Sequence, residues 1–154
     1  MANIKEKKTL LEKLQEARNH VKSTKHKKDG RNDYSKFDYF TPVTVDAIVT
    51  EACAATKIIP VCNLMRNEFG PYQEMKLYNL EDTKEEPLIF HLATAQSAMT
   101  ATNEAQQWGG TDTYSERYIK MKVFEIKDNN LDPDSKDNSV KKNAPVKTAE
   151  DLDF

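Results

Sequence analysis

The sequence has few cysteines and no long apolar run. Cys53 and Cys62 are its two cysteines and do not form a CxxC pair, which argues against a disulfide scaffold or a redox motif. We expect both to be reduced and to act as small apolar side chains. No segment approaches the roughly eighteen apolar residues of a membrane-spanning helix. The opening MANIKEKKTLL also lacks the apolar region of a signal peptide. These absences predict a cytoplasmic protein that does not contact a membrane.

Sequence motifs for nucleotide, metal or nucleophilic chemistry are also lacking. The chain contains no GxxxxGK[ST], no GxGxxG and no GxSxG, so a P-loop, a dinucleotide site and a nucleophile elbow are not expected. Its three histidines, His20, His26 and His91, do not have the spacing of a metal site. We expect His91, in an apolar segment, to be a core residue. The sequence predicts a binding protein with no metal and no cofactor.

Charge is distributed unevenly over the 154 residues, although the net charge is only −2. Residues 1–31 carry a net +6, residues 32–127 a net −5 and residues 128–154 a net −3. A basic start and an acidic end are typical of a polyanion-binding segment and an interaction tail. Residues 129–154 are poor in apolar side chains, so we expect a disordered acidic tail after a folded domain at 1–128.

Apolar spacing predicts an α+β fold with a sheet packed on helices. We expect helices at 4–22, 43–57 and 102–127, and an antiparallel meander of strands at 58–69, 72–81 and 88–95. Val45, Ile48, Val49, Ala52 and Cys53 share one face of the second helix. We expect a further strand at 34–40, with Tyr34 and Phe40 on one side. Gly109-Gly110 predicts a helix interruption or start, with Thr111 or Asp112 as cap.

Two clusters combine basic and aromatic side chains, as single-strand binding requires. Lysines and arginines neutralise phosphates, and aromatic rings stack on unpaired bases. The first cluster contains Lys22, Lys25, Lys27, Lys28, Arg31, Tyr34 and Tyr39 as candidate contacts, with Phe37 and Phe40 assigned to the core. The second contains Gly110, Thr113, Tyr114, Arg117, Lys120 and Lys122. In the second cluster we expect the glycine and a helix N-terminus to approach a phosphate.

The second cluster also carries a resemblance. The stretch QWGGTDTYSERYIKMKVFEI at 107–126, followed by DNNLDPD, resembles the signature of the Erf family of phage single-strand annealing proteins. Gly110, Thr113-Tyr114, Arg117-Tyr118 and Phe124-x-Ile126 carry the match, and the order of the preceding segments is similar over residues 9–134. Glu116 stands where the family has an arginine.

The resemblance implies an ATP-independent protein that binds single-stranded DNA and anneals complementary strands in phage recombination. It implies a bent antiparallel sheet of at least three strands on helices, assembly into a ring or filament, and no catalytic residues. The location would be the cytoplasm of the bacterial host. The acidic tail would contact a host or phage single-strand-binding protein. Three alternatives stay open: a protective single-strand-binding protein, a protein-interaction or regulatory module, and a small nuclease.

We predict that removal of residues 129–154 leaves folding and assembly intact, because this segment has too few apolar residues to contribute to a core. Circular dichroism and light scattering of the truncated chain would test this. An insoluble product, or a loss of assembly, would contradict it.

Overall fold

The computed structural model describes residues 6–98, 100 and 102–128. Its elements are α1 (Leu10–Ser23), β1 (Gly30–Asn32), β2 (Phe37–Tyr39), α2 (Pro42–Thr56), β3 (Ile58–Asn67), β4 (Gly70–Asn79), β5 (Leu88–Ala93) and α3 (Glu104–Val123). The strands form an antiparallel two-stranded sheet and an antiparallel three-stranded sheet. The expected α+β class, with a sheet packed on helices, is confirmed. The expected tail at 129–154 lies outside the described residues.

The meander expected between residues 58 and 95 is confirmed, with β4 between β3 and β5. Alternate β4 side chains, including Met75 and Leu77, are buried toward the helices. Two details differ from expectation. Leu80 lies beyond the end of β4 and is exposed. His91 is also exposed, and its Nε2 lies 3.1 Å from a Glu74 carboxylate oxygen, because the alternation of β5 turns Phe90 inward instead.

The first two helices begin at capping residues that the sequence contains. At α1, the Thr9 side chain accepts from the backbone of Glu12, whose carboxylate accepts from Thr9 N–H. This capping box starts the helix at Leu10, later than the expected residue 4. At α2, Thr41 is the cap and Pro42 follows it. The five residues predicted to share a face of α2 are all buried.

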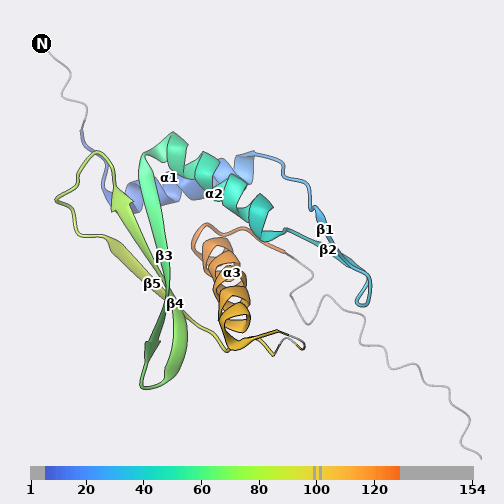
Figure 1. Ribbon diagram of the computed structural model, residues 1–154. Coiled ribbons are helices and arrows are strands. Elements are labelled where there is room, and N and C mark those ends of the chain that lie inside the picture. Colours follow the sequence, from blue (N-terminus) through green and yellow to red (C-terminus); the bar gives the residue numbers. More distant parts are fainter. Residues whose placement is uncertain (1–5, 99, 101, 129–154) are drawn as a thin grey trace, which may run out of the picture.

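Helix α3 (Glu104–Val123) lies within the expected range 102–127 and continues through its glycine pair. Asn103 is its N-cap, in a capping box with Gln106, so Gly109 and Gly110 lie within the helix. The prediction of an interruption or start at this glycine pair, capped by Thr111 or Asp112, is therefore wrong. Figure 1 shows α3 between the three-stranded sheet and the β1–β2 hairpin. None of the helices described is long and apolar enough to cross a membrane.

Only part of the strand expected at 34–40 is present, as β2, which pairs with β1 in a hairpin. Strands β1 and β2 pair from Gly30↔Tyr39 to Asn32↔Phe37. The Asn32 side chain accepts from Ser35 N–H, and Lys36 has a φ of 57°, so the chain reverses at 33–36. Tyr34 is 97% exposed on this turn, whereas Phe40 is buried after β2. The two therefore do not share a strand face.

A buried lysine joins α1 to the end of β4. The Lys13 side chain is 2% exposed, and its Nζ donates to Asn79 Oδ1 and Glu81 Oε2, both at 2.7 Å. The Lys57 Nζ also donates to Glu81, at 3.1 Å. The hydrogen bonds that Lys13 and Lys57 donate lower the pKa of Glu81 to about 2. Burial of the Lys13 amine is offset because oxygen acceptors surround it.

We predict that Lys13→Ala lowers the free energy of unfolding by about 2–4 kcal/mol, since it removes both packed volume and a buried charged donor. Lys57→Ala removes an exposed partner of the same carboxylate and is expected to cost less than about 1 kcal/mol. Denaturant unfolding of both variants would measure the difference. Equal effects would show that burial of Lys13 is not what matters.

Candidate nucleic-acid interface

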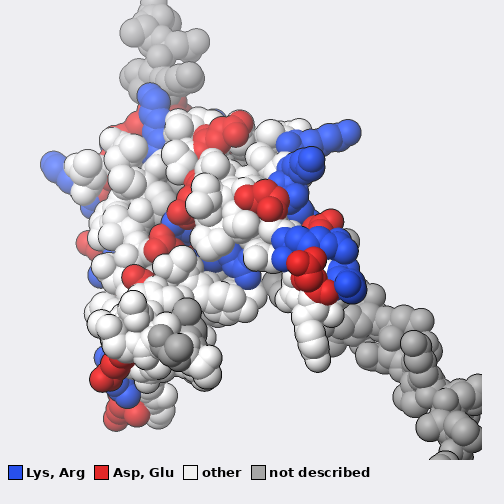
Figure 2. All heavy atoms as spheres, turned by 45° about the vertical axis from the view of Figure 1, so that its right-hand side comes forward, with Lys and Arg blue, Asp and Glu red and all other residues white. Residues whose placement is uncertain are grey.

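The basic residues of the first cluster lie in and around the loop at 24–29 and the β1–β2 hairpin. Lys25 and Lys27 are exposed and make no ion pair with another described residue. The other three are paired: Lys22 with Glu125 at 2.6 Å, Lys28 with Asp128 at 2.8 Å and Arg31 with Asp38 at 2.9 Å. Figure 2 shows Lys and Arg side chains gathered on the hairpin side of the molecule, with acidic side chains between them.

The hairpin is closed at its base by a carboxylate that sequence reasoning missed. Asp29, before β1, accepts from Thr41 N–H at 3.0 Å and from the Thr41 hydroxyl at 2.7 Å. These bonds, with one to the Thr44 side chain, lower the pKa of Asp29 to about 2. Because Thr41 is also the N-cap of α2, the carboxylate fixes the hairpin to the start of that helix.

Tyr39 and Gly30 pack together inside the hairpin. A Cβ placed on Gly30 would lie 2.6 Å from the Tyr39 ring, a contact that no side chain could make without displacement. The glycine lets the ring lie directly over the opposite strand. The ring edge also meets Phe37, with centroids 6.3 Å apart. Tyr39 is thereby held at a fixed position facing α3.

Arg117 lies between the hairpin and α3 and is buried, with 7% of its surface exposed. Its Nη1 donates to the Phe40 carbonyl at 2.7 Å. Its guanidinium carbon lies 4.7 Å from the Tyr118 ring centroid, 5.3 Å from Tyr114 and 5.4 Å from Tyr39. Its Nε is buried without a partner among the described residues. These contacts give the guanidinium a structural role, and contact with a phosphate stays a prediction.

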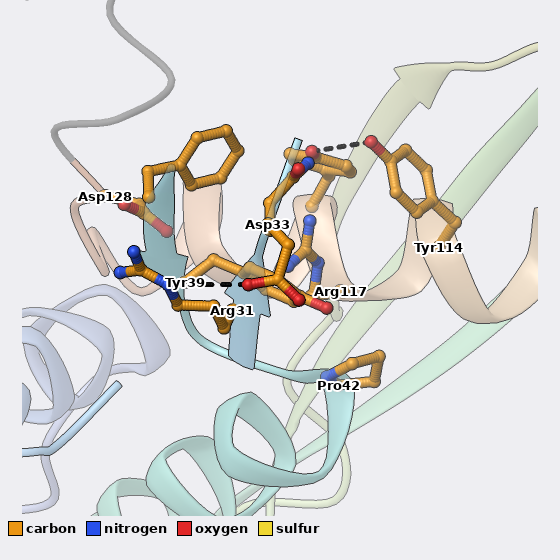
Figure 3. A pocket seen from close by; sticks show the side chains of 10 residues that line it. Arg31, Asp33, Tyr39, Pro42, Tyr114, Arg117 and Asp128 are labelled. Atoms are coloured by element: carbon orange, nitrogen blue, oxygen red, sulfur yellow. Dashed lines mark hydrogen bonds and ion pairs between the residues drawn. The ribbon is translucent and has the colours of Figure 1, made fainter. Parts of the chain in front are cut away.

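An open pocket of about 510 Å³ lies where the hairpin faces α3. Figure 3 shows side chains of both elements around it. The hairpin contributes Arg31, Phe37 and Tyr39, and the helix contributes Tyr114, Arg117 and Tyr118. The hydroxyls of Tyr114 and Tyr118 are hydrogen-bonded at 2.8 Å. Burial, together with this bond, raises the pKa of the Tyr118 hydroxyl. The structure thus brings members of both predicted clusters together.

The remaining residues of the second cluster do not line the pocket. Lys120 is buried, and its Nζ donates to Asp46 at 2.7 Å and to Glu116. Glu116, which stands where the Erf family has an arginine, therefore pairs with Lys120. Gly110 and Thr113 lie within α3, so the helix N-terminus expected beside them is absent from this site. Lys122 is exposed on the last turn of the helix.

The environment of the two cysteines limits the reactivity of their thiols. Burial raises the pKa of the Cys53 and Cys62 thiols to about 12, which keeps both protonated and unreactive. Within the described ranges, no group of three or more His, Cys, Asp or Glu residues is arranged to hold a metal ion.

Comparisons with family models, with curated proteins and with solved structures found no match.

We predict that Arg117→Ala lowers the free energy of unfolding by about 2–4 kcal/mol, because it removes a charged hydrogen bond and buried packing. Lys122→Ala, on the same helix but exposed, should change it by less than about 0.5 kcal/mol. Chemical denaturation would test both. A fully stable Arg117→Ala protein would show that the side chain is not structural, and would favour a direct role in ligand contact.

Proposed function

We propose that the protein binds single-stranded DNA without ATP and anneals complementary strands. The binding surface would be the loop at 24–29, the β1–β2 hairpin and the pocket between the hairpin and α3; we call this the hairpin surface. One observation carries the proposal: Lys25 and Lys27, which are exposed and make no ion pair within the described part of the chain, precede a hairpin whose aromatic rings help to form a pocket. Single-strand binding uses these two kinds of contact together.

The electrostatics of the hairpin surface suit a displaceable phosphate contact. Lys25 and Lys27 have no ion-pair partner among the residues that the structure describes, and so are available to neutralise phosphates. The Arg31–Asp38 pair has both side chains 54% exposed, so it is weak and a phosphate can compete for the guanidinium. By contrast, the Lys28 partner Asp128 has a side chain only 1% exposed, and this pair is better suited to holding the chain in place.

Annealing would follow from repeated weak contacts and involves no bond making. Each copy offers only a few free cations, so a homo-oligomeric ring or filament would add the contacts of many copies along one strand. Held by its phosphates, a strand keeps most base edges available for a partner strand. No catalytic residue or cofactor is needed for this mechanism.

We predict that Lys25→Gln with Lys27→Gln weakens binding to a labelled single-stranded oligonucleotide. The log–log salt slope should become shallower by roughly 1.4, about 0.7 for each lost phosphate contact. Lys7→Gln with Lys84→Gln removes the same charge far from the hairpin surface and should leave the slope unchanged. Fluorescence anisotropy over a salt series measures this. No single-strand binding at low salt would exclude the proposed function.

A second experiment with the same protein distinguishes strand annealing from strand protection. Two complementary strands, each coated with the protein, are mixed and duplex formation is followed by energy transfer between end labels. Annealing predicts faster duplex formation than for naked strands, whereas a protective protein slows it. A chain that binds neither strand but captures an acidic protein would instead be an interaction module.

A further inference from the structure

We propose that the pocket between the β1–β2 hairpin and α3 takes one unstacked nucleobase from the bound strand. This rests on the proposed function and adds what the pocket contributes to it. Its volume of about 510 Å³ falls within the roughly 300–1,000 Å³ range of small-molecule sites. The proposed ligand class is an uncharged planar heterocycle attached to a phosphodiester backbone.

The walls of the pocket are suited to a flat aromatic ring. Phe37 and Tyr39 face it from the hairpin, and Tyr114 and Tyr118 face it from α3. Aromatic side chains stack on any of the four bases, since every base has a π face. Tyrosine hydroxyls and the Asn32 amide, which also lines the pocket, can hydrogen-bond the edges of a base. Stacking and edge contacts are thus both available.

The charges in the pocket favour a base over a phosphate. Asp33 and Asp128 both line it. Asp128 is already paired with Lys28, so the exposed Asp33 is the carboxylate that would repel an entering phosphate. The Arg117 cation does not offset this freely, because it already donates to Phe40 and contacts three tyrosine rings. The Arg31 side chain is 54% exposed at the pocket. The backbone would therefore stay outside, near Arg31, while the base enters.

The aromatic walls are held in place before any ligand arrives. Tyr39 is fixed by its packing on Gly30, and the hydroxyls of Tyr114 and Tyr118 are joined by a hydrogen bond. Fixed walls lose little conformational freedom on binding, which favours affinity. A base in the pocket cannot pair at the same time. The pocket would therefore select single strands, and duplex formation would withdraw the base.

The experiment compares a thymidine oligonucleotide with an abasic oligonucleotide of equal length and charge, using the full chain. We expect the thymidine strand to bind roughly tenfold more tightly, the effect of stacking on an aromatic side chain. Tyr114→Leu should remove most of this difference, because it removes one aromatic wall of the pocket. Tyr114 is 57% exposed and leucine favours helix, so this variant is expected to fold. Tyr78→Leu, on the outer face of the three-stranded sheet, is the matched control.

The outcomes of this comparison distinguish failure of the base pocket from failure of the proposed function. Binding of both oligonucleotides with equal affinity, or a wild-type response from Tyr114→Leu, would overturn the base pocket while keeping the proposed function. Tyr34→Ala tests the hairpin tip: loss of the base preference there, and not in Tyr114→Leu, would move stacking to the exposed turn and also overturn the pocket. Binding of neither strand would overturn the proposed function itself.

Discussion

The arrangement of the candidate site depends on the contacts that the buried guanidinium of Arg117 makes. The hairpin strands have three residues each, and such a short two-stranded sheet is not stable alone. Asp29 closes its base, and Arg117 donates from α3 to the chain just after β2, at the Phe40 carbonyl. Burying this cation has a desolvation cost, which the carbonyl and the three tyrosine rings around it offset. The same rings form the walls of the pocket, so the contact that anchors the hairpin also shapes the site.

Much of the scaffold could be predicted from the sequence because its signals are local. Thr41-Pro42 marks the start of α2, and the apolar period then identifies its buried face without knowledge of its neighbours. The meander is equally readable: alternating segments are separated by a turn before Gly70-Pro71 and by the polar loop at 82–87. In these elements one face packs and the other is exposed, so local pattern and tertiary environment agree.

The site was harder to predict because its contacts are distant in sequence. The basic cluster looks uniformly available when charges are counted along the chain. Lys22 and Lys28, however, pair with carboxylates about 100 residues away, at Glu125 and Asp128. Helix α3 is contacted from more than one side, so Arg117 and Lys120 are buried although polarity suggests exposure. Gly109 and Gly110 remain helical because the Asn103 capping box starts the helix before them. An Asx-stabilised reversal at 33–36 likewise replaces the strand expected there.

The ion pairs of these lysines change how the affinity for a DNA strand would be divided between phosphate contacts and base stacking. Lys22, in the last turn of α1, and Lys28, in the loop that follows, hold the segment after α3 in place. Lys120 joins α3 to α2 through Asp46. Most basic side chains near the site therefore stabilise the fold, and few remain for phosphates. Under the proposed function, stacking on aromatic walls must supply a large share of the affinity of each copy, and repetition of copies along the strand must supply the rest. The near-neutral net charge is consistent with such a division, because a surface that binds mainly through rings needs only enough positive charge to position the backbone.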